Sequence, residues 1–168
     1  MNDGARLTHV DESGAARMVD VSGKDVTVRT ATASGRVLVS AEVVALLRGS
    51  GLPKGDALAV ARIAGIQAAK RTPDLVPLCH PIAIHGVEVD LRIGEDAVHV
   101  SATVRTADRT GVEMEALTCV AVAGLTLIDM VKAVDRAATM TDVRVEHKSG
   151  GRSGEWQRTG GAAEASSS

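Results

Sequence analysis

Residues 82–105, IAIHGVEVDLRIGEDAVHVSATVR, decide the fold of this chain. Apolar and polar side chains alternate from Ile82 to Ile93 and again from Val98 to Val104. Such alternation indicates strands with one buried face and one wetter face. Gly94-Glu95-Asp96, between the two runs, has the composition of a turn, so the stretch predicts a β-hairpin.

Helical patterns lie on both sides of this hairpin. Upstream, a short helix should follow Ser40, and a second should begin near Asp56 and end before Pro73, since Ser and Asp are good N-caps. Gly65 within the second helix would let a neighbouring element come close. Downstream, residues 111–134 form the longest helical candidate, with apolar residues spaced three to four apart on one face.

The remaining segments complete an α+β pattern. Residues 19–28 and 37–39 are β-rich with Gly35 between them as a turn candidate, and residues 143–145 make a last short strand. Prolines make residues 72–81 a rigid loop. Strands that arrive as hairpins, with few helices, predict an antiparallel sheet with helices packed on one face.

The length of 168 residues fits one domain. Residues 1–18 are expected to form a flexible N-terminal arm, residues 19–156 the single folded domain, and residues 157–168 a disordered tail. Two cysteines without a CxxC pair argue against a disulfide framework or a zinc cluster. The N-terminus lacks a signal peptide pattern, and the longest uncharged apolar-rich stretch, residues 116–128, is shorter than a membrane span. These features predict a cytoplasmic protein with free thiols.

Composition excludes several classes of partner. The formal net charge of −2 gives no electrostatic reason to expect nucleic acid or an anionic membrane. Trp156 is the only aromatic residue, which argues against base stacking of the kind used by single-strand nucleic-acid binders. The composition therefore predicts a ligand held by polar groups, backbone and aliphatic walls.

Two polar loops are candidates for chemistry. Lys54-Gly55-Asp56 is by itself best explained as an exposed lysine and a helix cap. In Leu78-Cys79-His80-Pro81 the flanking prolines would hold an imidazole in one orientation, although a histidine satisfied by backbone is equally compatible with the sequence. Metal ligation by Cys79 and His80 has weak support, because no second ligand cluster accompanies them.

The long helix carries charges at both ends. Glu113 and Glu115 lie in its first turn, where acidic side chains interact favourably with the helix dipole. This stabilising effect alone could explain both residues. Asp129 and Lys132, three residues apart, could form an ordinary surface ion pair worth under about 1 kcal/mol. They follow a 13-residue uncharged run, however, and a charge pair at the end of such a buried run favours a cleft.

The segment Lys148-Ser149-Gly150-Gly151-Arg152-Ser153-Gly154 is a basic glycine-rich loop. It lacks the GxxxxGK[ST] spacing of a Walker A loop. Successive glycine amides with a lysine and an arginine can still form a nest that binds an anion. Taken alone this signal is weak, because flexible basic loops are common.

Together these segments resemble the MoaC family, the molybdenum cofactor biosynthesis protein C family, over nearly all of residues 7–156. Arg152 stands where the family often has lysine and keeps the charge. The matching motifs, in order, are Leu7-Thr8-His9-Val10, Met18-Val19-Asp20-Val21-Ser22, Lys54-Gly55-Asp56, residues 61–72, residues 77–81, residues 110–117, residues 129–134 and residues 148–154.

The resemblance implies a cytoplasmic lyase. Its substrate would be (8S)-3',8-cyclo-7,8-dihydroguanosine 5'-triphosphate, made by a radical S-adenosylmethionine enzyme, and its products cyclic pyranopterin monophosphate and pyrophosphate. The family's fold is described as ferredoxin-like and α+β, and its assembly as a homohexamer, a trimer of dimers. The resemblance implies no organic cofactor, and the residues themselves show no metal cluster.

The resemblance also implies roles for individual residues. Asp129 would be the central acid/base residue, with Lys132 and Lys54 as cationic and proton-transfer partners. An ionised carboxylate such as Glu115 only accepts hydrogen bonds, which suits the N–H donors of a guanine-type ring. The residues expected to bind substrate are Leu78, Cys79, His80, Glu113, Met114, Glu115, Lys148 and Arg152.

Two rival functions remain open from the sequence. One is a ligand-binding module that binds the nucleotide without converting it, and the other is a metal-dependent hydrolase that uses Cys79, His80 and Glu115. Binding without pyrophosphate release would favour the first, and an activity sensitive to chelators would favour the second.

Helix geometry predicts where the site lies. Glu115 and Asp129 are 14 residues apart, which on one continuous helix is about 21 Å along the axis on nearly the same face. Two such helices, antiparallel across a twofold axis, would bring Glu115 of one chain beside Asp129 of the other. We therefore expect an active site shared between two chains at a dimer interface, unless Gly124 kinks the helix.

Overall fold

The computed structural model describes residues 7–49 and 56–159. The strands form one antiparallel sheet in the order β2-β3-β1-β4-β5. The order of β1 to β4 and the helices between them is the βαββαβ pattern of ferredoxin-like folds, so the predicted α+β class is confirmed. The elements are β1 (Thr27–Leu38), α1 (Ala41–Arg48), α2 (Ala57–Lys70), α3 (Thr72–Leu75), β2 (Gly86–Ile93), β3 (Ala97–Asp108), α4 (Glu113–Val131), β4 (Thr139–Ser149) and β5 (Trp156–Gln157).

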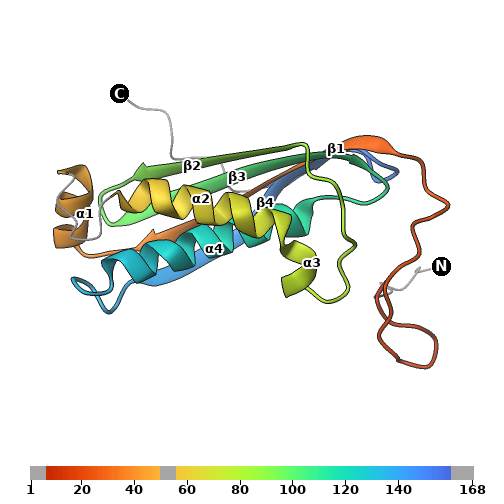
Figure 1. Ribbon diagram of the computed structural model, residues 1–168, viewed down its shortest axis with the longest axis horizontal. Helices are drawn as coiled ribbons and strands as arrows, with labels where there is room; N and C mark the ends of the chain where they lie inside the picture. Colours follow the sequence, from red (N-terminus) through yellow and green to blue (C-terminus); the bar gives the residue numbers. More distant parts are fainter. Residues whose placement is uncertain (1–6, 50–55, 160–168) are drawn as a thin grey trace.

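Helices α2 and α4 lie side by side on one face of the sheet, as Figure 1 shows. Alternate residues of β1 and β3 are buried, among them Ala33, Val37, Val100 and Val104, and α4 packs against both strands. Burial of these small aliphatic side chains is the main force that holds the two layers together. The prediction that the helices pack on one face of an antiparallel sheet is thus confirmed.

Two glycines set how closely the layers approach. A Cβ at Gly65 of α2 would lie 3.0 Å from the Cys119 carbonyl oxygen of α4, so glycine allows the close approach that the sequence predicts. The turn predicted at Gly35 is wrong, because Gly35 lies inside β1. A Cβ there would lie 2.9 Å from a methyl carbon of Val120, so this glycine makes room for α4 on the sheet rather than for a turn.

Several predicted boundaries also differ from the structure. Residues 19–26 contain no strand, and the chain from Thr72 begins with the short helix α3, which accepts Pro73 in its first turn. Strand β2 begins only at Gly86. Residues 82–85 lie beside β3 but make only isolated hydrogen bonds to it, such as the one from the His85 amide to the Arg105 carbonyl oxygen (2.9 Å), and not a regular ladder. The predicted hairpin and its turn are otherwise confirmed.

The C-terminal strands reach further than predicted. Strand β4 covers eleven residues instead of the predicted 143–145, and β5 pairs with it through Trp156 and Gln157. The Arg158 guanidinium donates to the Val145 carbonyl oxygen at 2.8 Å. Gln157 and Arg158 are therefore ordered parts of the sheet edge, where the tail was expected to begin, and residues 160–168 lie outside the described part of the chain.

Helix α4 is continuous over 19 residues, with no interruption at Gly124. A Cβ at Gly124 would lie 2.7 Å from the Met140 sulfur, so this glycine also serves packing. By length and hydropathy α4 could cross a membrane, but half of that window is buried within the fold, which is the pattern of a core helix. The unbroken helix fixes Glu115 and Asp129 near its opposite ends.

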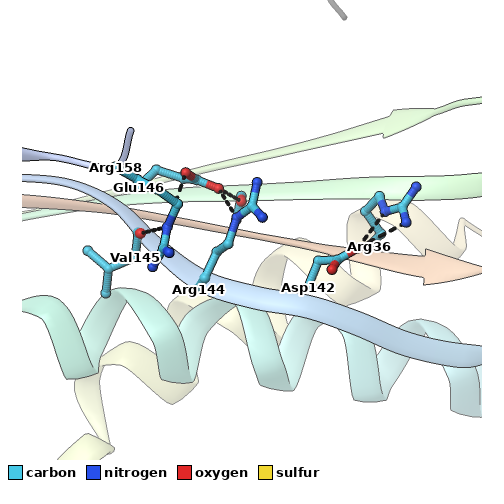
Figure 2. Close-up of polar contacts among 7 residues, drawn as sticks. Arg36, Asp142, Arg144, Val145, Glu146 and Arg158 are labelled. Carbon is cyan, nitrogen blue, oxygen red and sulfur yellow. Dashed lines mark hydrogen bonds and ion pairs between the residues drawn. The ribbon is translucent and has the colours of Figure 1, made fainter. Parts of the chain in front are cut away.

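Polar side chains hold β1, β4 and β5 together on the other face of the sheet (Figure 2). Glu146 accepts hydrogen bonds from the Ser34 hydroxyl (2.5 Å) and the Arg144 guanidinium (2.7 Å), and Arg36 forms an ion pair with Asp142 (2.9 Å). These contacts fix β4 against β1, and the end of β4 carries Lys148.

Candidate active site

A cleft of about 670 Å³ lies between the N-terminal segment, the start of α4 and the end of the sheet. The loop after α3 forms another part of its wall. Of the residues predicted to bind substrate, the cleft is lined by Leu78, Cys79, His80, Glu113, Met114, Glu115 and Lys148.

His80 is held in one orientation by the backbone. Its Nε2 lies 2.6 Å from the carbonyl oxygen of Val19, and a carbonyl can only accept, so Nε2 carries the proton. With the proton on Nε2, Nδ1 is the acceptor nitrogen in the neutral form of the ring. The backbone-satisfied histidine and the cleft histidine, which the sequence left as alternatives, are the same residue.

Glu113 and Lys148 form an ion pair across the cleft. The Lys148 ammonium lies 3.1 Å from the Glu113 carboxylate and donates to the Ser153 hydroxyl at 3.1 Å. Gly111 lies directly under the Glu113 carboxylate, where a Cβ would collide with it. Both side chains are about a quarter to a third exposed, so the pair presents a positive and a negative group to a ligand.

The glycine-rich loop packs on Arg29 of β1. Gly150 and Gly151 have positive φ angles of 93° and 73°, and a Cβ on either would collide with the Val28 carbonyl or the Arg29 guanidinium. Arg29 in turn donates to the Asp108 carbonyl oxygen at 3.0 Å. Arg152 is exposed on this loop and does not line the cleft, so the structure brings Lys148, but not Arg152, to the other predicted binding residues.

The predicted catalytic residues lie elsewhere in the chain. The Lys132 ammonium is 2.5 Å from the Asp129 carboxylate at the C-terminal end of α4, and both side chains are more than half exposed. Neither residue lines the cleft at the other end of the helix. Lys54 lies outside the described residues. One chain therefore separates its predicted catalytic pair from its predicted binding residues.

Comparisons with known proteins identify the family. The MoaC family profile matches residues 18–151, which is most of the chain. The chain belongs to the MoaC family. It is 72% identical over 154 residues to a protein of Streptomyces coelicolor named cyclic pyranopterin monophosphate synthase, covering 92% of this chain and 91% of that protein.

More distant relatives carry the same name. A Mycobacterium tuberculosis protein named cyclic pyranopterin monophosphate synthase 2 is 61% identical over 152 residues, covering 90% of this chain and 91% of the relative. A Parvibaculum lavamentivorans protein named cyclic pyranopterin monophosphate synthase is 60% identical over 154 residues, covering 90% and 96%. The similarity thus extends over nearly the full length of each relative.

The cleft of this MoaC-family chain includes residues that the sequence-based site did not contain. Thr8 and His9 reach it from the segment expected to be a flexible arm, and Lys24 and Trp156 add a cation and an aromatic ring. Thr8 and His9 belong to the first motif shared with the family, which was a usable signal. Lys24 lies between two of the shared motifs, and Trp156 follows the last motif at the end of the region of resemblance.

Glu115 is a buried carboxyl group in the cleft of this MoaC-family chain. Its side chain is almost fully buried, with 3% exposure. Burial, reinforced by the charge of Glu113, raises the pKa of Glu115 from 4.5 to about 7. Burial also raises the pKa of the neighbouring Cys79 thiol, with a smaller contribution from the charge of Glu115. A carboxyl group with a pKa near neutrality can take up or release a proton at working pH.

This pKa predicts a pH-dependent stability. Between pH 4.5 and about 7 the folded chain keeps a proton on Glu115 that the unfolded chain releases, so the free energy of unfolding falls as the pH rises. Glu115→Gln should remove this decline, as measured by urea unfolding at several pH values across that window. Glu88→Gln, at an exposed position on β2, is the control and should keep it. A Glu115→Gln protein with the wild-type pH profile would show that Glu115 does not titrate there.

The described part of the chain contains no set of side chains suited to hold a metal ion. No three His, Cys, Asp or Glu side chains gather there in a geometry that could hold an ion. His80 already uses Nε2 on the Val19 carbonyl. The Cys79, His80 and Glu115 set of the hydrolase alternative therefore lacks the geometry of a metal centre.

Proposed function

We propose that this chain converts (8S)-3',8-cyclo-7,8-dihydroguanosine 5'-triphosphate to cyclic pyranopterin monophosphate with release of pyrophosphate. The observation that carries the proposal is the cleft that gathers Glu113, Glu115, His80 and Lys148, in a chain of this family. Rebuilding a purine ring as a pterin and closing a cyclic phosphate require proton transfers, which carboxylate, imidazole and ammonium groups at suitable pKa values can carry.

The residues divide into two groups in this proposal. Glu115 and the loop of Leu78, Cys79 and His80 hold the ring system, where a carboxylate accepts from ring N–H and amino donors. Asp129 acts as the acid/base residue, and Lys132 and Lys54 stabilise the negative charge that develops as pyrophosphate leaves. The ion pair of Asp129 with Lys132 holds the carboxylate in one orientation between turnovers.

The separation of the two groups supports a site shared between chains. Glu115 and Asp129 lie about 21 Å apart along one continuous helix. The exposed side of α4 carries apolar side chains, with Met114 40% exposed just before Glu115 and Leu125 60% exposed between Glu115 and Asp129. An antiparallel partner helix on this stripe would bury it and place each Asp129 beside the other chain's Glu115. Each dimer would then hold two sites.

The wider setting follows from the family resemblance. We propose that the dimers assemble into a homohexamer, a trimer of dimers, in the cytoplasm. A radical S-adenosylmethionine enzyme would supply the cyclised substrate. The catalytic domain would be residues 19–156, with Thr8 and His9 of the arm completing the cleft wall.

The direct test is to incubate the purified chain with the cyclised dihydro-GTP and to measure pyrophosphate and the pterin product. The proposal predicts both products in equal amounts, without an added organic cofactor. Binding of the substrate without pyrophosphate release would contradict the proposal and favour a binding module. Loss of activity with a chelator, restored by a metal ion, would favour the hydrolase.

Lys148 and Arg152 are expected to act on the triphosphate. Arginine suits bidentate phosphate contacts, and the loop's glycine amides add to them. The double variant Lys148→Ala/Arg152→Ala should raise KM by roughly tenfold or more, since each charged hydrogen bond contributes about 1.5–3 kcal/mol. Added salt should weaken binding in the wild type more than in the variant.

Lys70→Ala is the matched control, because Lys70 is an exposed cation at the end of α2 and does not line the cleft. It should leave KM and its salt dependence unchanged. If the wild type and the double variant respond equally to salt, the loop does not contact the phosphates.

A further inference from the structure

Trp156 places the only aromatic ring of the chain in the cleft. The sequence contains one Trp and no Phe or Tyr, and the composition therefore predicts a ligand site with aliphatic and polar walls alone. In the structure, however, Trp156 also lines the cleft and is 41% exposed, so an aromatic ring forms part of the wall. A large aromatic side chain left this open beside a cleft has free surface for a ligand.

One face of the ring is already occupied. The Arg158 guanidinium lies 5.6 Å from the centre of the indole ring, within the range of a cation–π contact. Arg158 is itself held by the Val145 carbonyl oxygen (2.8 Å) and lies 3.8 Å from the Glu146 carboxylate, as Figure 2 shows. Arg158 lies over one face of the ring and is held there by Val145 and Glu146. A planar ligand can therefore stack only on the opposite face of Trp156.

The neighbour of Trp156 on the cleft wall is a cation. The register of β4 and β5 pairs Trp156 directly with Lys148, so their side chains stand next to each other on the sheet edge. Both residues line the cleft. The wall therefore offers a π surface and an ammonium side by side, which fits a ligand whose planar ring carries an anionic group close to it.

We infer that Trp156 stacks on the planar ring system of the purine-derived ligand, while Lys148 contacts the adjacent phosphate. The inference rests on the proposed function for the identity of the ligand, and on the cleft geometry for the contact. Aliphatic side chains of Val19, Val21 and Leu78 also line the cleft and can complete the walls around the ring. Trp156 thus adds ring recognition to the polar contacts of Glu115.

Fluorescence gives a direct test, since all tryptophan emission of this chain comes from Trp156. We expect GTP, a stable guanine nucleotide, to quench the emission saturably. Tripolyphosphate, which carries the anion without the ring, should bind without comparable quenching. Unchanged emission at GTP concentrations that calorimetry shows to be saturating would overturn the inference.

Kinetics give an independent test. Trp156→Leu should raise KM for the cyclised substrate roughly tenfold, the scale of a lost base–aromatic contact, with a smaller change in kcat. Trp156→Phe should recover most of that loss, because it restores an aromatic face. Inhibition by tripolyphosphate should be equal in all three proteins. Leu75→Ala, at an exposed apolar position outside the cleft, is the control and should leave KM unchanged. Equal KM values for Trp156→Leu and Trp156→Phe would overturn the inference.

The stacking contact and the proposed function can be overturned separately. A wild-type protein that releases pyrophosphate, together with a Trp156→Leu protein of wild-type KM, would overturn the stacking contact and leave the proposed function standing. A wild-type protein that does not convert the substrate, but whose emission is quenched by GTP and not by tripolyphosphate, would overturn the function and support the contact.

Discussion

Replacing Asp129 with Asn, or Lys132 with Ala, should lower turnover by about 100-fold or more, the scale of losing a proton-transfer group. The fold should remain intact, because the Asp129–Lys132 ion pair is more than half exposed and such pairs contribute under about 1 kcal/mol to stability. The measurement is kcat from pyrophosphate release, with thermal unfolding recorded for each variant. A large loss of kcat without a change in Tm would assign both residues to the reaction.

The sheet offers a matched control. Asp142 forms a similar exposed ion pair with Arg36 on the face of the sheet opposite the helices (Figure 2). Asp142 has a positive φ of 56°, a conformation that Asn also tolerates, so Asp142→Asn changes the charge without straining the backbone. It should leave kcat within about twofold, since surface changes away from the site have small effects. Near-normal turnover of Asp129→Asn or Lys132→Ala would remove that residue from the mechanism.

Leu125→Asp should separate the chains and abolish most of the activity. Leu125 is 60% exposed in the apolar stripe of α4, about one helical turn before Asp129. An antiparallel partner helix would bury this position, and burying an unpaired carboxylate costs about 3–5 kcal/mol. We expect the dimer to dissociate at assay concentrations and turnover to fall by about 100-fold or more, because each separate chain holds only part of a site.

Analytical ultracentrifugation and the pyrophosphate assay on the same samples measure both effects. Leu75→Asp is the control, because Leu75 is similarly exposed at 59% but lies on α3 rather than on α4. It should keep the wild-type mass and activity. A monomeric Leu125→Asp protein with wild-type turnover, or one that assembles as the wild type does, would contradict the pairing through α4.

Most of the fold could be predicted from local sequence periodicity. The alternating runs on either side of Gly94 predict the β2–β3 hairpin, and the apolar spacing of residues 111–134 predicts α4. One error came from Gly35, because a turn glycine and a packing glycine look alike in sequence. Gly35 lacks a side chain because Val120 of α4 fills the space, and that contact joins residues 85 positions apart. No local pattern contains such a contact.

The candidate site was predictable where residues are close in sequence or share a motif. Leu78, Cys79 and His80 reach the cleft as predicted, and the distance between Glu115 and Asp129 followed from helix geometry alone. Trp156 was missed because its place in the cleft depends on the pairing of β5 with β4, which two residues of strand do not reveal. The role of Asp129 and Lys132 stays a prediction.

Subunit complementation tests the central claim, a site built from Glu115 of one chain and Asp129 of another. Glu115→Ala and Asp129→Asn should each be inactive alone. After demonstrated exchange of an equal mixture, about half of the dimers are mixed, and each mixed dimer holds one intact site and one doubly damaged site. The account predicts recovery of about a quarter of wild-type activity. No recovery, despite exchange shown by labelled chains, would contradict a shared site.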